Sequence, residues 1–135
     1  MMAGKTGRCL CGAIEYAFET DSADVTVCHC GQCRKWSGHL WASVTVPYDT
    51  LNVSKGADQL GWFRSSDYAR RGFCRNCGST LFWHADRLDD HKHSIAIAAG
   101  GVDAPTGLDL TGHIFMDDKG DYYGVSDDLP QKAQY

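Results

Sequence analysis

The chain contains 135 residues, of which 43% are hydrophobic and 22% charged, so we expect one globular domain and exclude a largely disordered chain. Its net charge of −4 argues against a nucleic-acid-binding protein, and no apolar run approaches the roughly 18 residues of a membrane span. The first residues lack the apolar core of a secretion signal, so we expect a cytoplasmic protein that binds neither nucleic acid nor membranes.

Alternation of apolar and polar residues predicts strands along most of the chain. Residues 8–19 alternate with a period of two, which places Leu10, Ile14 and Tyr16 on one side of a half-buried strand. Further strands are expected at Leu40–Val46, Leu60–Arg64, Ala69–Phe73, Thr80–His84, Ser94–Ala99, Gly112–Met116 and Tyr122–Val125. Single helical turns could follow Cys30 and lie near Asp127–Gln131. Eight short strands separated by turn-forming residues predict a mainly β, antiparallel, single-domain fold.

Seven cysteines are the most unusual feature of the composition. An odd number of cysteines without a secretion signal disfavours a disulfide framework, and closely spaced thiols in a reducing compartment are more often metal ligands or catalytic groups. They occur as Cys9-x-Cys11, Cys28-x-Cys30-x-x-Cys33 and Cys74-x-x-Cys77. Each short spacing can bring two sulfurs to one ion, and Zn²⁺ prefers four soft ligands at tetrahedral corners. The pattern therefore predicts zinc.

The seven cysteines divide most simply into a group of four and a group of three. The three in Cys28–Cys33 are self-contained, so we expect them to bind a catalytic zinc whose fourth position is free for water or substrate. The remaining four then form a closed structural zinc site: Cys9, Cys11, Cys74 and Cys77. The alternative for the three-cysteine group is a second structural zinc, completed by a histidine or by a partner protein.

Several other residues have a structural and a functional interpretation. His29 lies between two ligands of an extended segment and should point away from their metal, and we expect His84, His91 and His93 at the surface. The aromatic residues are expected to pack in the core, although Trp36 and Trp41 flank the open site and could wall a pocket. The Asp-rich stretch at residues 117–128 is expected to be a solvated surface.

Three motifs together resemble the glutathione-dependent formaldehyde-activating enzyme family, which also includes centromere protein V. They are Gly7-x-Cys9-x-Cys11-Gly12, Cys28-His29-Cys30-x-x-Cys33-Arg34-Lys35 and Arg71-Gly72-Phe73-Cys74-x-x-Cys77-Gly78-Ser79-x-Leu81. The resemblance extends over residues 5–130, nearly the whole chain. It implies one zinc-binding domain with a β-tent fold, with Cys9, Cys11, Cys74 and Cys77 matching the structural site and Cys28, Cys30 and Cys33 the catalytic site.

The resemblance also implies an activity: the joining of glutathione and formaldehyde to S-hydroxymethylglutathione, classed in reverse as a carbon–sulfur lyase. Three thiolates on Zn²⁺ leave a net charge of −1, so we expect capture of a thiol rather than activation of a carbonyl. A cationic rim should attract anionic glutathione, and the candidates are Arg34, Lys35, Arg70 and Arg71, unless these are ordinary surface charges. His29 or His113 could move the proton.

Two other functions use similar scaffolds. A zinc-bearing β-tent can serve as a non-catalytic interaction module, which is the alternative to the lyase; the basic extension that would favour this alternative is absent. Methionine sulfoxide reduction requires a free nucleophilic cysteine beyond the metal ligands, and no cysteine follows Cys77. The true thiol or aldehyde and the oligomeric state are not predicted.

Overall fold

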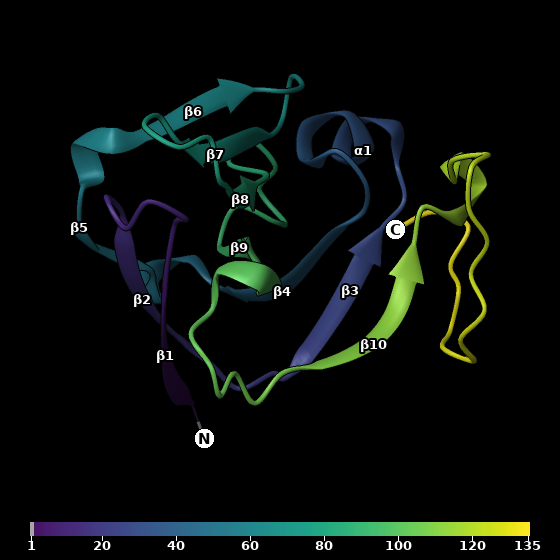
Figure 1. Cartoon of the computed structure of the whole chain (residues 1–135), viewed down its shortest axis with the longest axis horizontal. Helices are drawn as coiled ribbons and strands as arrows, with labels where there is room; N and C mark the ends of the chain where they lie inside the picture. Colours follow the sequence, from purple (N-terminus) through teal and green to yellow (C-terminus); the bar gives the residue numbers. More distant parts are fainter. Residues whose placement is uncertain (1) are drawn as a thin grey trace.

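The structure is a computed structural model that describes residues 2–135, and it forms one mainly β domain with two sheets (Figure 1). The strands are β1 (Ala3–Arg8), β2 (Glu15–Thr20), β3 (Asp24–Cys28), β4 (Trp41–Pro47), β5 (Asn52–Lys55), β6 (Leu60–Arg64), β7 (Arg70–Cys74), β8 (Thr80–His84), β9 (Ser94–Ala98) and β10 (Asp109–Ile114). One short helix, α1 (Gly31–Ser37), follows β3, and four 3₁₀ turns lie at Tyr48–Thr50, Ala57–Gln59, Ala99–Gly101 and Met116–Asp118. Within residues 2–135 there is no helix with the length and apolarity that crossing a membrane requires.

The strands form a small sheet, in the order β1-β2-β5, and a large sheet, in the order β10-β3-β4-β9-β8-β7-β6. Every pair is antiparallel except β10 with β3, which run parallel side by side in Figure 1. The chain after β10 returns along this edge, where Lys132 donates its backbone N–H to the carbonyl oxygen of His113. The mainly β, single-domain expectation is confirmed, with this one parallel pair as the exception to an antiparallel arrangement.

The large sheet has two faces that bury different side chains. Along β4, Val44 and Val46 belong to the main core, together with Tyr16 and Phe18 of β2 in the small sheet. The intervening β4 residues point the other way, because successive side chains of a strand alternate. This second face carries a smaller apolar cluster around Cys28, Cys33, Trp41, Ala96 and Ala98. The first face stabilises the fold, and the second positions the candidate site.

The expected strand over residues 8–19 is wrong in its first half. The chain leaves β1 at Arg8, turns, and begins β2 only at Glu15. The turn exists because Cys9 and Cys11 face a common cluster and Gly12 has a φ of 78°, in the left-handed region that favours glycine. Leu10, expected on the buried side, is 89% exposed, whereas Ile14 is buried as expected.

Other expectations near the chain ends are also wrong. Tyr122–Val125 is not a strand and Asp127–Gln131 is not helical. The side chains of Tyr123 and Asp127 contact His29 and His113, and the Pro130 carbonyl oxygen accepts the backbone N–H of His113. The last strand ends at Ile114 rather than Met116, since Phe115 adopts a φ of 57°. The sequence reasoning missed β1, β3 and β5. β10 begins three residues before the expected Gly112, whereas β4, β6, β7, β8 and β9 lie within one residue of their expected bounds, and a helix does follow Cys30.

Candidate metal centres

The first candidate centre brings together two segments that are more than 60 residues apart. The sulfur atoms of Cys9, Cys11, Cys74 and Cys77, the four-cysteine cluster, all lie within 4.8 Å of one another. The Cys9 and Cys11 sulfurs are 3.6 Å apart, and those of Cys11 and Cys74 are 3.8 Å apart. Zinc with a Zn–S distance near 2.3 Å requires sulfur–sulfur separations of about 3.8 Å at tetrahedral corners. The cluster therefore fits a zinc ion bound by four thiolates.

Local backbone geometry explains how these cysteines converge. Gly12 and Gly78 directly follow the two cysteine pairs, and both have a positive φ. Each closes a turn by donating its backbone N–H to the carbonyl oxygen of the first cysteine in its pair, at 3.2 Å to Cys9 and 2.8 Å to Cys74. Each sulfur that begins a pair also accepts a backbone N–H, as Cys74 does from Cys77. Such bonds hold sulfurs in position for a metal.

The second candidate centre comes from a single segment at the end of β3. The sulfurs of Cys28, Cys30 and Cys33, the three-cysteine cluster, lie within 4.8 Å of one another. Cys28 ends β3, and Cys30 is the residue that caps α1, where its sulfur accepts the backbone N–H of Cys33 at 3.4 Å. A helix turn that starts between two ligands thus folds the third ligand back onto the first.

The pKa values of the thiols show why each cluster suits a cation. The neighbouring thiols of Cys28 and Cys33 lower the pKa of Cys30 to about 2, while the contact with Cys30 raises that of Cys28. In the other cluster, the hydroxyl of Ser79 lowers the pKa of Cys77 to about 5. Sulfurs this close repel one another when more than one is ionised, and a bound dication removes that repulsion.

The buried Arg71 supports the three-cysteine cluster. It is 3% exposed, and its Nη1 donates to the sulfur of Cys33 at 3.4 Å while its Nη2 donates to Gln32 Oε1 at 3.2 Å. Its guanidinium also lies 5.1 Å from the ring centre of Trp36. A cation in this position offsets the negative charge of the thiolates and holds Cys33 in place.

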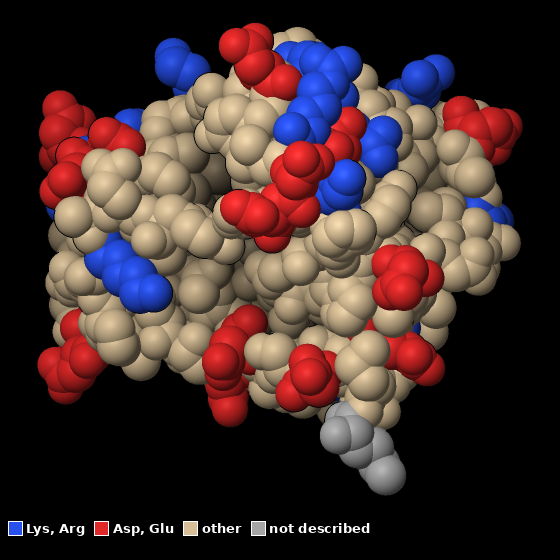
Figure 2. Space-filling model, turned by 180° about the vertical axis from the view of Figure 1, so that it is seen from behind, with Lys and Arg blue, Asp and Glu red and all other residues tan. Residues whose placement is uncertain are grey.

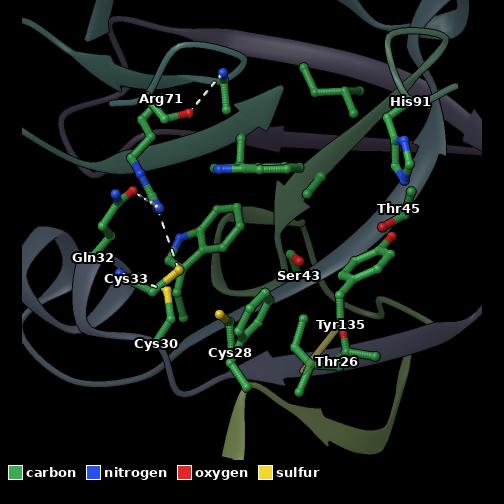
Figure 3. A pocket seen from close by; sticks show the side chains of 18 of the residues that line it. Thr26, Cys28, Cys30, Gln32, Cys33, Ser43, Thr45, Arg71, His91 and Tyr135 are labelled. Atoms are coloured by element: carbon green, nitrogen blue, oxygen red, sulfur yellow. Dashed lines mark hydrogen bonds between the residues drawn. The ribbon is translucent and has the colours of Figure 1, made fainter. Parts of the chain in front are cut away.

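A cavity of about 470 Å³ opens from the three-cysteine cluster. In Figure 3 the cysteines lie at one end with Gln32 and Arg71 beside them, while Thr45, His91 and Tyr135 lie at the other end. Strands β4 and β9 contribute the small side chains Ser43 and Ala96, which leave the space open. None of the cysteines of the four-cysteine cluster lines this cavity. Of the two candidate centres, the three-cysteine cluster is the one that faces it.

The four cations expected around the substrate lie in different places. Arg71 lines the cavity, whereas Arg34, Lys35 and Arg70 do not. Arg34 donates to the backbone oxygens of His29 and Asp118, and Lys35 is exposed on α1. Arg70 directly precedes Arg71 in β7, so its side chain points to the opposite side of the strand. It stacks over Trp62 at 4.0 Å and pairs with Asp86 at 3.6 Å.

His29 and His113 belong to a hydrogen-bonded network outside the cavity, whereas His91 lines it. His29 is fully buried and, as expected, takes no part in the cysteine cluster. Its Nε2 lies 2.9 Å from Nδ1 of His113, whose Nε2 is 3.0 Å from Asp127, and its Nδ1 is 2.7 Å from the Tyr123 hydroxyl. Asp127 only accepts, so each ring can donate through Nε2 and accept at Nδ1 as a neutral imidazole. The network fixes the backbone between two cysteines.

The expectation that His84 lies at the surface is wrong, although His91 and His93 are exposed. His84 is 3% exposed, donates from Nε2 to the carbonyl oxygen of Lys92 at 2.9 Å, and accepts a hydrogen bond from Arg70 at Nδ1. Burial lowers its pKa, and Arg70 adds to that effect. His84 lies on the same face of β8 as the buried Phe82, because every second side chain of a strand points to the same side. The polar residue type of His84 gave no indication of this burial.

The chain is similar in sequence to one protein family and to several of its relatives. Residues 4–118 match the family model described as glutathione-dependent formaldehyde-activating enzyme. The chain is 29% identical over 117 residues to an uncharacterised lyase of Schizosaccharomyces pombe, with 87% of this chain and 82% of that protein covered. It is 34% identical over 82 residues to a Podospora anserina protein provisionally named as a glutathione-dependent formaldehyde-activating enzyme, covering 58% of this chain and 38% of that protein.

The chain is also similar to one solved structure and to a further relative. A crystal structure of a Rhodobacter sphaeroides protein superposes with a TM-score of 0.65 at 22% identity, over 93% of this chain and 98% of that one, which shows the fold alone. A Phaeosphaeria nodorum protein with the same provisional enzyme name is 32% identical over 85 residues, covering 62% of this chain and 44% of that protein. The chain thus spans less than half of the two longer relatives.

Proposed function

The chain belongs to the glutathione-dependent formaldehyde-activating enzyme family, and on that premise we propose that it is a zinc-dependent carbon–sulfur lyase acting on a thiol–aldehyde adduct. The relatives' names suggest glutathione and formaldehyde as the first pair of reactants to test. The observation that carries the proposal is the position of the three-cysteine cluster at the inner end of a cavity, with three ligands and room for a fourth.

The reaction requires one bond to form and one proton to move. In the direction of adduct formation, a sulfur electron pair forms the bond to the aldehyde carbon, and the π pair of the C=O bond moves to oxygen. The oxygen takes up the proton that the thiol loses, so the product is a hydroxymethyl thioether. The reverse reaction breaks the same carbon–sulfur bond and releases both reactants.

The donor set of Cys28, Cys30 and Cys33 fits zinc, whose other preferred ligands are the thiolate of a substrate or water. A bound zinc would supply a coordination position at which a thiol is held as its thiolate at neutral pH. The protein's own part is to orient the ligands. Arg71 holds Cys33 through Nη1 and compensates thiolate charge, and the His29–His113–Asp127 network fixes the chain between Cys28 and Cys30.

The cavity walls would keep water from the reacting atoms. Trp41, Trp83 and Phe115 line the space beside the cysteines, so a substrate held there is surrounded largely by apolar surface. Exclusion of water strengthens the electrostatic interactions of the thiolate and limits loss of the adduct to solvent. Positioning the two reactants in one cavity also reduces the entropy cost of bringing them together.

The test is formation of the hydroxymethyl adduct by zinc-loaded protein, followed by NMR with formaldehyde and each of two thiols, glutathione and phenylmethanethiol. We expect a rate above the spontaneous one with at least one thiol, and its loss in Cys30→Ser. Asp58→Asn, an exposed residue of the Ala57–Gln59 turn, is the control and should keep the wild-type rate. Zinc-loaded protein that accelerates neither reaction would contradict the lyase proposal.

A further inference from the structure

The cavity beside the three-cysteine cluster has few charged groups. Among the residues of 2–135 that line it, Arg71 is the one lysine or arginine and Asp118 the one aspartate or glutamate. The rest of the wall combines apolar and aromatic side chains, including Trp41, Trp83, Ile95 and Phe115, with uncharged polar ones such as Ser43. Small-molecule sites of this kind orient an apolar ligand through a few polar groups.

The one cation in the wall is already engaged. Arg71 is 3% exposed, donates to Cys33 and Gln32, and stacks near Trp36, so its charge faces the cysteine sulfurs. A carboxylate of a ligand would have to compete with the thiolates for this guanidinium. Such competition is unfavourable, because it would leave a buried thiolate cluster without its nearest positive charge.

The outer part of the site carries charges of both signs. Asp118 lines the cavity and is exposed, and Asp117 and Lys119 are its immediate neighbours in the sequence. Arg34 does not line the cavity, and its Nη2 donates to the backbone oxygen of Asp118. Elsewhere on the surface, Lys and Arg are interspersed with Asp and Glu, and no broad basic area is visible on the face in Figure 2. Nothing here resembles a cationic cradle for two carboxylates.

Glutathione carries two carboxylates and one ammonium at neutral pH, which is a poor match for this wall. We propose that the preferred thiol of this site is uncharged and bears an aromatic or branched aliphatic group, rather than glutathione. This inference rests on the proposed lyase function and names its substrate class. The aromatic wall would contact such a group face-on or edge-on, and removal of its apolar surface from water would favour binding.

The sharpest test uses two thiols of nearly equal size that differ by one carboxylate. Phenylmethanethiol and 4-(sulfanylmethyl)benzoate would be titrated into zinc-loaded protein, with glutathione as the third ligand. Binding would be read by calorimetry and by tryptophan fluorescence, because Trp41 and Trp83 line the cavity. We expect phenylmethanethiol to bind at least tenfold more tightly than either anionic thiol. Equal or tighter binding of glutathione would overturn the inference.

Two variants separate the contributions of shape and charge. Ala96→Leu fills the cavity floor and should weaken phenylmethanethiol at least fivefold, whereas Ala57→Leu, outside the cavity, should leave its affinity unchanged. Asp118→Asn alters an exposed side chain, so the fold should be kept. It should tighten binding of 4-(sulfanylmethyl)benzoate about two- to fivefold without changing phenylmethanethiol. No change with Asp118→Asn, or tighter phenylmethanethiol binding in Ala96→Leu, would contradict the proposed wall.

Failure of the inference differs from failure of the lyase proposal. If glutathione binds best and is turned over with formaldehyde, the lyase proposal stands and the substrate class is wrong. If none of the three thiols binds at the cavity, and neither glutathione nor phenylmethanethiol reacts with formaldehyde faster than it does spontaneously, both proposals are wrong.

Discussion

The four-cysteine and three-cysteine clusters contain the same kind of ligand in very different surroundings. The first joins the turn after β1 to the turn between β7 and β8, and its buried members Cys9 and Cys74 belong to the main core. The second comes from one segment, lies on the other face of the large sheet, and borders a cavity. One cluster ties distant parts of the chain together, and the other leaves a ligand position facing open space.

The two clusters differ in the burial of their sulfur atoms and in the groups that donate hydrogen bonds to them, not in the type of ligand. The sulfurs of the four-cysteine cluster receive backbone N–H groups and side-chain donors such as Asn76 Nδ2, 3.2 Å from Cys11. The three-cysteine cluster receives the backbone N–H of Cys33 and, in addition, the positively charged guanidinium of Arg71. A site with four protein thiolates has no vacancy to fill, whereas a site with three requires a fourth ligand.

The largest expected effect is loss of the fold on breaking the four-cysteine cluster. Cys74→Ser removes one of four ligands and leaves buried thiolates uncompensated. Zinc contributes on the order of 10 kcal/mol in small zinc domains, comparable to the about 5–15 kcal/mol that stabilises a whole domain. We expect insoluble protein or loss of the cooperative thermal transition, measured by circular dichroism. A Cys74→Ser protein that melts like the wild type would contradict a structural role.

Breaking the three-cysteine cluster should have a smaller effect on stability. Cys30→Ser should reduce zinc from two ions per chain to about one, measured by elemental analysis, while the far-ultraviolet spectrum stays unchanged. The reason is that Cys28, Cys30 and Cys33 are close in sequence and link no distant segments. If Cys30→Ser and Cys74→Ser lose structure equally, the difference between the clusters disappears and a second structural zinc is favoured.

Arg71 should tune the open cluster without holding the fold together. Arg71→Gln keeps a donor for Cys33 but removes the charge. We expect a loss of about 10- to 100-fold in zinc affinity or activity, the usual range for groups that support metal ligands. Competition with a chelator would measure the affinity of the weaker zinc, and Arg87→Gln, an exposed residue outside the cavity, serves as the control. Unchanged affinity and activity in Arg71→Gln would remove the proposed role.

The smallest effect concerns pH, at His84, which belongs to neither cluster. Burial lowers the pKa of His84 below its usual value near 6.5, so the unfolded chain binds this proton more readily. The stability that neutral His84 contributes is therefore fully present above about pH 6.5. It is lost as the pH falls from there toward the lower pKa of His84 in the folded protein. The groups facing it are Arg70, Tyr48, Asp86 and the Lys92 carbonyl oxygen.

His84→Gln should keep one hydrogen bond and lose this titration. We expect a destabilisation of about 1 kcal/mol at pH 7.5 and a flatter melting-temperature profile between pH 5 and 7.5 than in wild type. Both proteins would be measured with zinc in excess, so metal loss affects them alike. Parallel profiles for the two proteins would contradict the assignment of a neutral, buried His84.

The sequence predicted each close group of cysteines well because these groups depend on local spacing, whereas the meeting of Cys9 and Cys11 with Cys74 and Cys77 joins segments distant in sequence. Three cysteines within six residues meet through one helix turn, and glycines at positions 12 and 78 close the other two turns. Ile14 and Tyr16 were also expected on one buried face, and both are buried. Leu10 was misplaced because the Cys9–Gly12 turn breaks the alternation there.

The cavity could not be predicted in the same way. Its walls depend on β4 lying beside β9 and on β3 lying beside β10, pairings between segments distant in sequence. Arg70 and Arg71 were treated alike, although strand alternation separates them. Cys74 faces the main core, so Arg71, three positions earlier, faces the other side, and this parity is the signal that could have identified it.

We propose that the four-cysteine cluster is a closed metal site and that the three-cysteine cluster accepts an exogenous ligand. Cadmium NMR tests it directly, because ¹¹³Cd²⁺ is a soft metal that replaces zinc at thiolate sites and gives one resonance per site. Phenylmethanethiol would be titrated into protein loaded with two ¹¹³Cd²⁺ ions. We expect two resonances, of which one stays fixed and one shifts, the shifting resonance being absent in Cys30→Ser. Two resonances that both remain fixed throughout the titration would contradict an open site.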